Sequence, residues 1–264
     1  MSAGQDVGAG AEGSPFELVN AEGTAPVLLL CDHASHMIPA DLASLGLDDV
    51  QRSTHIAWDA GAAEVTRGLS RRLDAPAILA RYSRLVVDLN RDPGEASLIP
   101  KEVDSIVVPG NQGLGTAERD QRVATFHLPY HRAVAETVER LAARGPGPAV
   151  VSIHSFTPVL NGVERPWQVG ILSDRDKRLS GPMLSSLRDV GLLVGDNEPY
   201  SGTDIYGYTV QQHAGPRGLA NVIVELRQDQ VDTPSGAFEW VERLERTLCA
   251  ALDDPQVLER GVAA

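Results

Sequence analysis

Cysteine, basic residues and long apolar runs are all scarce in this chain of 264 residues. Two cysteines cannot build a disulfide framework or a cysteine-rich metal site, so we expect neither. Basic residues number 23 against 36 acidic ones, which gives a net charge of −13. A chain this acidic has no general attraction for phosphate backbones or anionic membranes. We therefore expect neither nucleic acid nor a membrane as a partner.

The sequence also lacks the segments that direct a chain into or across a membrane. No apolar run exceeds about five residues, whereas a membrane-spanning helix needs about 18. No Lys or Arg precedes Arg52, so the basic start of a secretory signal is missing. These absences predict a globular cytoplasmic protein, and a homo-oligomer is compatible with them. Neither a phosphate-binding P-loop nor the G-x-S-x-G elbow of serine hydrolases occurs.

From residue 26 onward, short apolar runs alternate with amphipathic segments. The runs predict strands and the segments predict helices. The strands are expected at Val27–Cys31, Ala77–Ala80, Leu85–Asp88, Val150–Ile153, Gln168–Leu172 and Asn221–Leu226, and the helices at Trp58–Leu73, Ala117–Arg144, Lys177–Val190 and Gly236–Leu252. Apolar strands that alternate with helices are typical of a mostly parallel sheet covered on both faces.

We therefore predict an α/β fold, with three α/β/α layers around a mostly parallel mixed sheet. A single catalytic domain is expected over residues 16–264. Residues 1–15 are mostly Gly, Ala, Ser and acidic residues without periodicity, which is typical of a flexible tail.

Polar side chains follow four of the apolar runs. His33 lies two residues after the first run, His154 directly follows the fourth, and Glu225 lies near the end of the last. Asn90 and Arg91 follow the third run. One histidine after a strand is commonly a packing residue. Because open parallel sheets bind ligands at the carboxyl ends of their strands, four such groups together indicate a site.

The chemistry indicated is metal-assisted hydrolysis. A catalytic zinc has three protein ligands and one position open to water, and neutral imidazoles suit it. His33 and His154 supply two ligands, and the third is left open among His36, His55 and Asp59. Asp59 lies four residues after His55, so a helix would place both on one face. A carboxylate beside two histidines is a known catalytic zinc set, but Asp59 could equally be an ordinary helix-surface residue.

Glu225 fits the general base of such a site, because it could take a proton from the attacking water and pass it to the leaving nitrogen. The alternative is a buried glutamate paired with Arg227, which strand alternation places on the same face. A carboxylate within a run of Val and Ile is costly to bury unless it is paired or used. We favour its use in catalysis.

Asn90 and Arg91 fit the recognition of a substrate carboxylate. A guanidinium grips a carboxylate through two parallel hydrogen bonds, and an adjacent amide can take a remaining lone pair. Arg84 lies seven residues before Arg91 and is a candidate for a second carboxylate, with a surface residue as the alternative.

These residues lie in stretches that resemble the N-formylglutamate amidohydrolases, a family distantly similar to zinc carboxypeptidases and aspartoacylases. The matching stretches, in the order of the family, are Cys31–His36 with Ile38–Pro39, His55–Gly61, Val87–Arg91, Pro129–His131, Ser152–Ser155, Asp196–Tyr200, His213 and Val224–Gln228. The resemblance implies a phosphorylase/hydrolase-like fold and a zinc-dependent amidohydrolase with one zinc per chain. The family hydrolyses N-formyl-L-glutamate to formate and L-glutamate, a step of histidine degradation.

The resemblance also favours Asp59 over His36 as the third zinc ligand, because the family does not depend on a ligand at position 36. His131 belongs to the family pattern and is a candidate substrate contact, although a buried structural pair with His127 is the plainer alternative. Tyr200 and His213 flank a Gly-rich stretch that could be a mobile lid, with Tyr200 on the substrate and His213 in catalysis. An ordinary surface loop is the alternative.

The sequence thus predicts a zinc enzyme that hydrolyses the N-acyl amide of an acidic amino acid, with N-formyl-L-glutamate as the first substrate. The alternatives are a related zinc carboxypeptidase, an N-acylaspartate deacylase, or a non-catalytic binding protein of the same fold.

Overall fold

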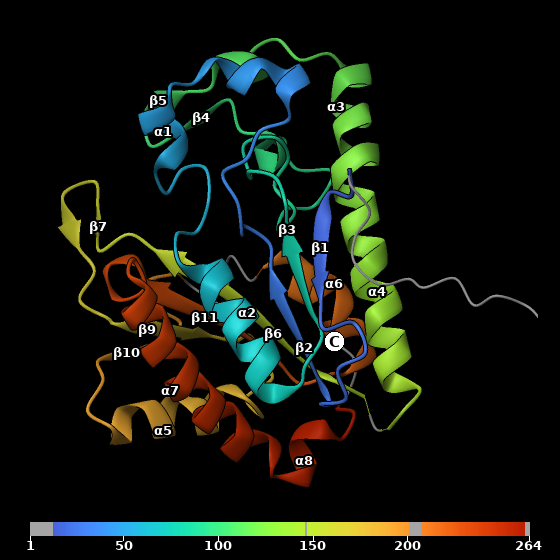
Figure 1. The fold of residues 1–264 in the computed structure, drawn as a ribbon, viewed down its shortest axis with the longest axis vertical. Coiled ribbons are helices and arrows are strands. Elements are labelled where there is room, and N and C mark those ends of the chain that lie inside the picture. The colour runs from blue at the N-terminus through green and yellow to red at the C-terminus, as the bar shows by residue number, and fades with distance from the viewer. Residues whose placement is uncertain (1–12, 146, 201–206, 262–264) are drawn as a thin grey trace, which may run out of the picture.

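One seven-stranded sheet runs through the computed structural model, which describes residues 13–145, 147–200 and 207–261 (Figure 1). In spatial order its strands are β1 (Phe16–Val19), β3 (Ala77–Ala80), β2 (Val27–Cys31), β6 (Ala149–Phe156), β11 (Asn221–Arg227), β9 (Val169–Leu172) and β10 (Val194–Asp196). Within the described part of this sheet, the β1–β3 and β11–β9 pairings are antiparallel and the other four are parallel. The predicted mostly parallel mixed sheet is confirmed.

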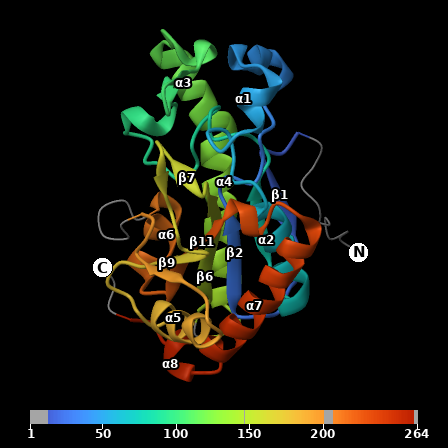
Figure 2. The same cartoon turned by 90° about the vertical axis from the view of Figure 1, so that its left-hand side faces the viewer.

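Helices cover both faces of this sheet, as Figure 2 shows. Residues along β2 alternate between the faces: Leu28 and Leu30 join one apolar cluster, and Val27 and Leu29 join the other. The first cluster is completed by α4 (Leu128–Ala142) and α6 (Tyr208–His213), and the second by α2 (Ala62–Leu73), α5 (Ser180–Asp189) and α7 (Pro234–Leu252). The three-layer α/β/α prediction is therefore confirmed.

Shorter elements connect these layers. They are the helices α1 (Asp49–Ser53), α3 (Thr116–Arg122) and α8 (Pro255–Leu258), the hairpins β4 (Glu102–Val103) with β5 (Ile106–Val107) and β7 (Val159–Leu160) with β8 (Val163–Glu164), the 3-10 turns Ala40–Gly46, Ala96–Leu98, Pro109–Asn111, Gly215–Arg217 and Gln228–Gln230, and the π turn Val123–His127. That π turn joins α3 to α4, so the helix expected over Ala117–Arg144 is a composite. None of the described helices is both long and apolar enough to cross a membrane.

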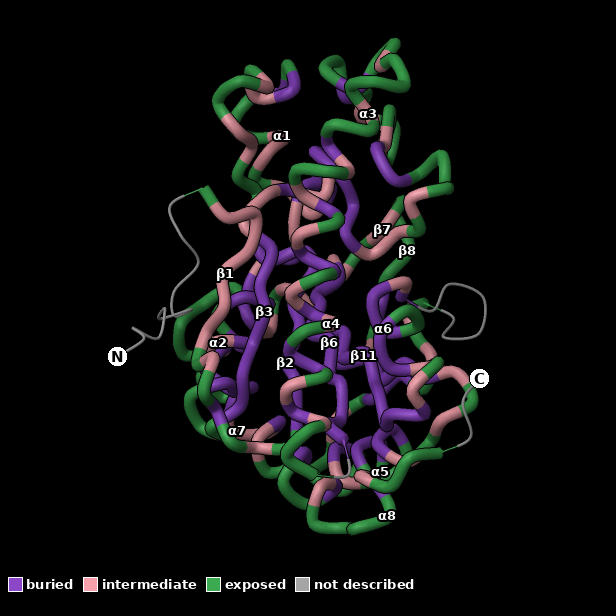
Figure 3. Tube along the Cα trace, turned by 90° about the vertical axis from the view of Figure 1, so that its right-hand side faces the viewer, coloured by how far each residue is buried: buried purple, intermediate pink, exposed green. Residues whose placement is uncertain are grey.

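A small apolar cluster packs against β4 and β5, which lie with α1 at the top of Figure 1. Its buried members are Leu45, Leu47, Ile56, Ala57, Leu85, Val86 and Val108. Most of the chain around it is exposed, whereas the central strands below are buried throughout (Figure 3).

The run Leu85–Asp88 begins in this cluster with Leu85 and Val86 and is not a strand, so that prediction is wrong. Its carbonyls are bound by remote side chains: Asn111 Nδ2 donates to Leu85 O at 2.8 Å, and Arg122 Nη1 donates to Val86 O at 3.1 Å. A buried irregular segment held in this way has the same local apolar pattern as a buried strand.

Helix α2 begins at Ala62 rather than at Trp58, because Gly61 interrupts it with φ +80°. A Cβ at Gly61 would lie 2.5 Å from Val231, so the position requires glycine. His55 and Asp59 therefore lie in a loop, and the prediction that they share a helical face is wrong. The strands β1 and β10 were not predicted. Most of the tail expected over residues 1–15 lies outside the described residues.

Candidate active site

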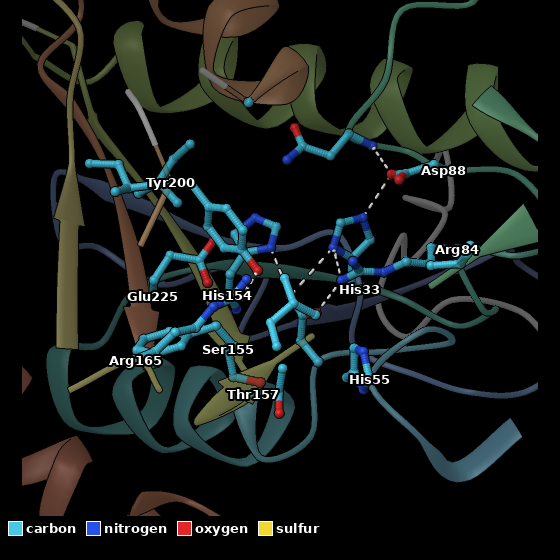
Figure 4. A pocket seen from close by; sticks show the side chains of 18 of the residues that line it. His33, His55, Arg84, Asp88, His154, Ser155, Thr157, Arg165, Tyr200 and Glu225 are labelled. Carbon is cyan, nitrogen blue, oxygen red and sulfur yellow. Dashed lines mark hydrogen bonds and ion pairs between the residues drawn. The ribbon is translucent and has the colours of Figure 1, made fainter. Parts of the chain in front are cut away.

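A cavity of about 340 Å³ lies at the carboxyl ends of the central strands (Figure 4). Its lining includes nine of the residues singled out in the sequence: His33, His55, Asp59, Arg84, Asn90, Arg91, His154, Tyr200 and Glu225. His33 and Asp59 come from the loops after β2 and before α2, while His154 and Glu225 lie on the adjacent strands β6 and β11. The convergence expected at the ends of the strands is what the fold produces.

The side chains of His33, Asp59 and His154 form one buried group. Their possible metal-binding atoms all lie within 4.8 Å of one another. His154 Nδ1 is 2.8 Å from Asp59 Oδ2, and His33 Nδ1 is 3.4 Å from the same oxygen. In residues 13–145, 147–200 and 207–261, no other set of histidine, cysteine and carboxylate side chains meets this spacing.

Each of these histidines meets a second carboxylate through its far nitrogen. His33 Nε2 is 2.7 Å from Asp88 Oδ1, and His154 Nε2 is 3.4 Å from Asp32 Oδ2 and 3.0 Å from Ser152 Oγ. A carboxylate behind an imidazole fixes the orientation of the ring and makes the opposite nitrogen a better metal ligand. The Nδ1 atoms of both histidines therefore face Asp59 and are the candidate ligand atoms.

The electrostatics of the group follow from these contacts. Burial opposes the charge on Asp59, but Arg84 and His33 outweigh it and hold the pKa of that carboxyl well below its usual range. Burial likewise opposes protonation of His154, yet its contacts with Asp32 and Asp59 raise the pKa of that imidazole well above 6.5. The ionised carboxylates around these histidines thus stabilise positive charge at this place.

Arg84 supplies part of that positive charge. Its Nη2 donates to Asp59 Oδ1 and to His33 Nδ1. The guanidinium predicted to grip a second substrate carboxylate thus lines the cavity and contacts two of the candidate metal ligands. One lone pair serves one partner, so a metal on His33 Nδ1 would replace this hydrogen bond.

Glu225 is buried beside His154, to which it pairs in register across β6 and β11. Burial raises the pKa of this carboxyl to about 7, and its Oε2 has no hydrogen-bond partner within the part of the chain that the structure describes. Arg227 is 2.7 Å from Asp229 instead, so the alternative Glu225–Arg227 pair does not form.

Asn90 and Arg91 line the same cavity. Asn90 Oδ1 accepts a hydrogen bond from the backbone N–H of Thr209 at 3.1 Å, which fixes the amide. Arg91 Nε lies 3.9 Å from Asp88 Oδ2, and 36% of the Arg91 side chain is exposed. The guanidinium is thus held loosely and remains accessible to a ligand.

His131 and His213 do not line the cavity. With His127 they form a separate buried set, the helix-layer histidines, on α4, α6 and the π turn before α4. His131 Nδ1 is 2.9 Å from His213 Nε2, and the His127 and His131 rings pack at a tilt of 35° with centroids 4.2 Å apart. The structure thus shows the buried histidine packing offered as the alternative for His131.

The remaining candidates divide between the cavity and the surface. Tyr200 lines the cavity, but residues 201–206 of the expected lid lie outside the described residues. His55 also lines the cavity, where its Nε2 pairs with Asp104 Oδ2 at 2.7 Å. His36 is exposed and packs edge-on against Trp58 with ring centroids 4.8 Å apart. Asp59, and neither of these histidines, completes the buried group.

Sequence reasoning missed three residues at the cavity or behind it: Asp32, Asp88 and Arg165. The sequence could have indicated Asp32 and Asp88, because each is a carboxylate at the end of an apolar run. Arg165 follows the short hairpin strand β8, in a stretch with no apolar periodicity, and only the fold brings it to the cavity.

A sequence model of the N-formylglutamate amidohydrolase family matches residues 25–231. Among solved structures, a gene product of Agrobacterium tumefaciens is 38% identical with a TM-score of 0.90, over 93% of this chain and 98% of that one. An N-formylglutamate amidohydrolase from Ralstonia eutropha is 21% identical with a TM-score of 0.66, over 92% of this chain and 99% of that one. The comparison with curated proteins finds no match.

Proposed function

The chain belongs to the N-formylglutamate amidohydrolase family, and on that premise we propose that it is a zinc-dependent enzyme that hydrolyses the N-acyl amide of an acidic amino acid. The proposed substrate is N-formyl-L-glutamate, which is cleaved to formate and L-glutamate. The observation that carries the proposal is the buried group of His33, Asp59 and His154 with Glu225 beside it in one cavity.

The donor set fits one zinc ion per chain. Two imidazole nitrogens and one carboxylate oxygen are a known catalytic zinc shell, and the cavity beside them leaves room for water and substrate. The carboxylates of Asp88 and Asp32 behind the two histidines are the partners that such ligands usually have. When bound, zinc would polarise the acyl carbonyl and lower the pKa of a water molecule in the site.

Glu225 would act as the general base. It accepts a proton from the attacking water and delivers that proton to the leaving nitrogen as the C–N bond breaks. Its place beside His154 and its oxygen without a hydrogen-bond partner support this role. Arg91 and Asn90 would hold a substrate carboxylate and so orient the amide toward Glu225.

This reaction would serve a route of histidine degradation, in the cytoplasm, in a single catalytic domain over residues 16–264. The role in histidine degradation depends on the proposed substrate, whereas the location and the domain bounds are proposed from the sequence pattern.

The direct test is formate release from N-formyl-L-glutamate by purified protein, measured after removal of metal with a chelator and again after addition of zinc. The proposal expects turnover that disappears with the metal and returns with zinc. Turnover that is unaffected by chelation would contradict the zinc requirement. Zinc-dependent cleavage of N-acetyl-L-aspartate or of a peptide, without cleavage of N-formyl-L-glutamate, would keep the reaction class but contradict the proposed substrate.

A further inference from the structure

Arg165 is a buried arginine that faces the cavity, and the reaction described above does not use it. Only 9% of the residue is exposed. Its guanidinium carbon lies 5.1 Å from the centre of the Tyr200 ring and 5.8 Å from that of Phe156, and its Nη1 donates to Tyr200 Oη at 3.1 Å. Two aromatic rings thus hold the guanidinium plane in the wall of the cavity.

The backbone around Arg165 is fixed as well. Its N–H donates to Pro158 O at 2.8 Å, across the β7–β8 hairpin. Arg227 Nη1 donates to Pro166 O at 2.9 Å, and the Arg227 side chain is itself held by Asp229. The position of Arg165 is therefore set before any ligand arrives, which lowers the entropic cost of binding one.

The charge on Arg165 has no counterpart within the described residues. The other two arginines that line the cavity are Arg84, which contacts Asp59, and Arg91, which lies 3.9 Å from Asp88. No described carboxylate comes within 4.0 Å of the Arg165 guanidinium, although the side chain is nine-tenths buried. A buried charge without a partner is costly, and a ligand that brings the opposite charge removes that cost.

We propose that Arg165 anchors the side-chain carboxylate of an N-acyl dicarboxylic amino acid, while Arg91 holds the α-carboxylate. This inference rests on the proposed function and adds the determinant of the substrate side chain. Figure 4 shows Arg165 on the side of Glu225 and Tyr200, with Arg84 and Asp88 across the two histidines. Phe156, which lies against Arg165, and Leu160 also line the cavity, and their apolar side chains suit the methylene groups of a glutamate side chain.

The test is Arg165→Met, assayed with N-formyl-L-glutamate and with N-formyl-L-glutamine, which has the same shape but no side-chain charge. The variant should raise KM for the glutamate substrate about 10- to 100-fold and leave kcat nearly unchanged, because one charged hydrogen-bonded contact is lost. KM for the glutamine substrate should change less than about threefold. Arg165→Lys keeps the charge, so its KM for N-formyl-L-glutamate should lie between those of the wild type and of Arg165→Met.

Arg243→Met is the matched control. Arg243 also lies over an aromatic ring, with its guanidinium carbon 5.3 Å from the centre of Trp240, but it lies on α7 and does not line the cavity. Its loss should leave KM for both substrates unchanged. An equal rise in KM for both substrates in Arg165→Met would contradict the assignment to the side-chain carboxylate, as would no rise at all.

Calorimetric binding of N-formyl-L-glutamate to Glu225→Gln, with and without Arg165→Met, separates this inference from the proposed reaction. Binding weakened by Arg165→Met supports the anchor, even if the wild-type protein cleaves nothing. Binding unaffected by the substitution overturns the anchor and leaves the reaction standing. Absence of binding and of cleavage for every N-acyl dicarboxylate tried would overturn both. Should Arg165→Met fail to fold, Arg165→Lys carries the same comparison.

Discussion

Two sets of buried histidines lie in different parts of this molecule, and their surroundings differ. His33 and His154 lie at the cavity, and each contacts carboxylates through both ring nitrogens. The helix-layer histidines His127, His131 and His213 contact backbone carbonyls and one another. Burial lowers the pKa of His131 to about 3 and that of His213 to about 4, whereas neighbouring carboxylates outweigh burial and raise the pKa of His33 and His154.

The difference shows that the partners of a buried histidine, more than its burial, decide what it can do. Carboxylates orient the imidazoles of His33 and His154 and make them suitable ligands for a cation. The neutral helix-layer histidines fill space and satisfy the carbonyls of Leu89 and Arg91. These hydrogen bonds hold the loop that carries Asn90 and Arg91.

The largest expected effect is the difference between two substitutions, one in each set of histidines. His154→Gln should lose bound zinc and reduce turnover about 1,000-fold or more, because the proposed metal would lower the barrier by several kcal/mol. His131→Gln should retain zinc and keep turnover within about tenfold. Turnover and zinc content of the two purified variants measure this, and equal losses would remove the distinction between the sets.

Glu225→Gln tests chemistry at the cavity without changing a candidate ligand. Turnover should fall by about 10² to 10⁴, the usual contribution of a general base, while the zinc content stays the same. The measurement is kcat of the zinc-loaded variant beside its metal content. Retained turnover would contradict the assignment of Glu225 as the general base.

A moderate effect is expected from the carboxylate behind His154. Asp32 accepts hydrogen bonds from Tyr130 Oη and Thr209 Oγ1, so it is fixed behind the imidazole. Asp32→Asn should weaken zinc affinity about 10- to 100-fold, as loss of such a partner usually does. Zinc titration against a chelating dye measures this affinity, and Asp49→Asn, a substitution at an exposed residue, is the control. An unchanged affinity would mean that Asp32 does not support the ligand.

The smallest effect concerns the pH dependence of stability. The pKa of His213 is about 4 in the folded chain, below the ordinary value of about 6.5, so between these values only the unfolded chain binds the proton. Stability should therefore be full above about pH 6.5 and fall as the pH is lowered toward 4. In metal-free protein, His213→Gln should lose a few degrees less in Tm than wild type between pH 7 and 5. A parallel pH dependence in the two proteins would contradict the neutral state, and His36→Gln serves as the surface control.

Much of the fold and part of the site could be predicted because their signals are local. The apolar runs at Val27–Cys31 and Asn221–Leu226 are strands, as their patterns indicated. His33 follows the first strand, Glu225 lies near the end of the second, and both side chains line the cavity. The resemblance to the N-formylglutamate amidohydrolases is likewise confirmed, since it depends on short stretches of sequence.

What could not be predicted depends on contacts between distant residues. The apolar pattern of Leu85–Asp88 predicts a strand, but its backbone partners, Asn111 and Arg122, come from remote segments that the local pattern does not reveal. Arg165 carries no sequence signal, because the fold alone brings it to Tyr200 and Phe156. The sequence pattern around His131 and His213 gives no direction for their side chains, and the fold turns them toward each other rather than toward the cavity.

The most direct test of this account is the number of zinc ions bound per chain, measured by elemental analysis after equilibrium dialysis of wild-type protein and of Asp59→Ala. We predict one zinc per wild-type chain and none in the variant, because Asp59 lies between both candidate histidine ligands. A wild-type chain that binds no zinc, or a stoichiometry that survives Asp59→Ala, would contradict the assignment of the metal to His33, Asp59 and His154.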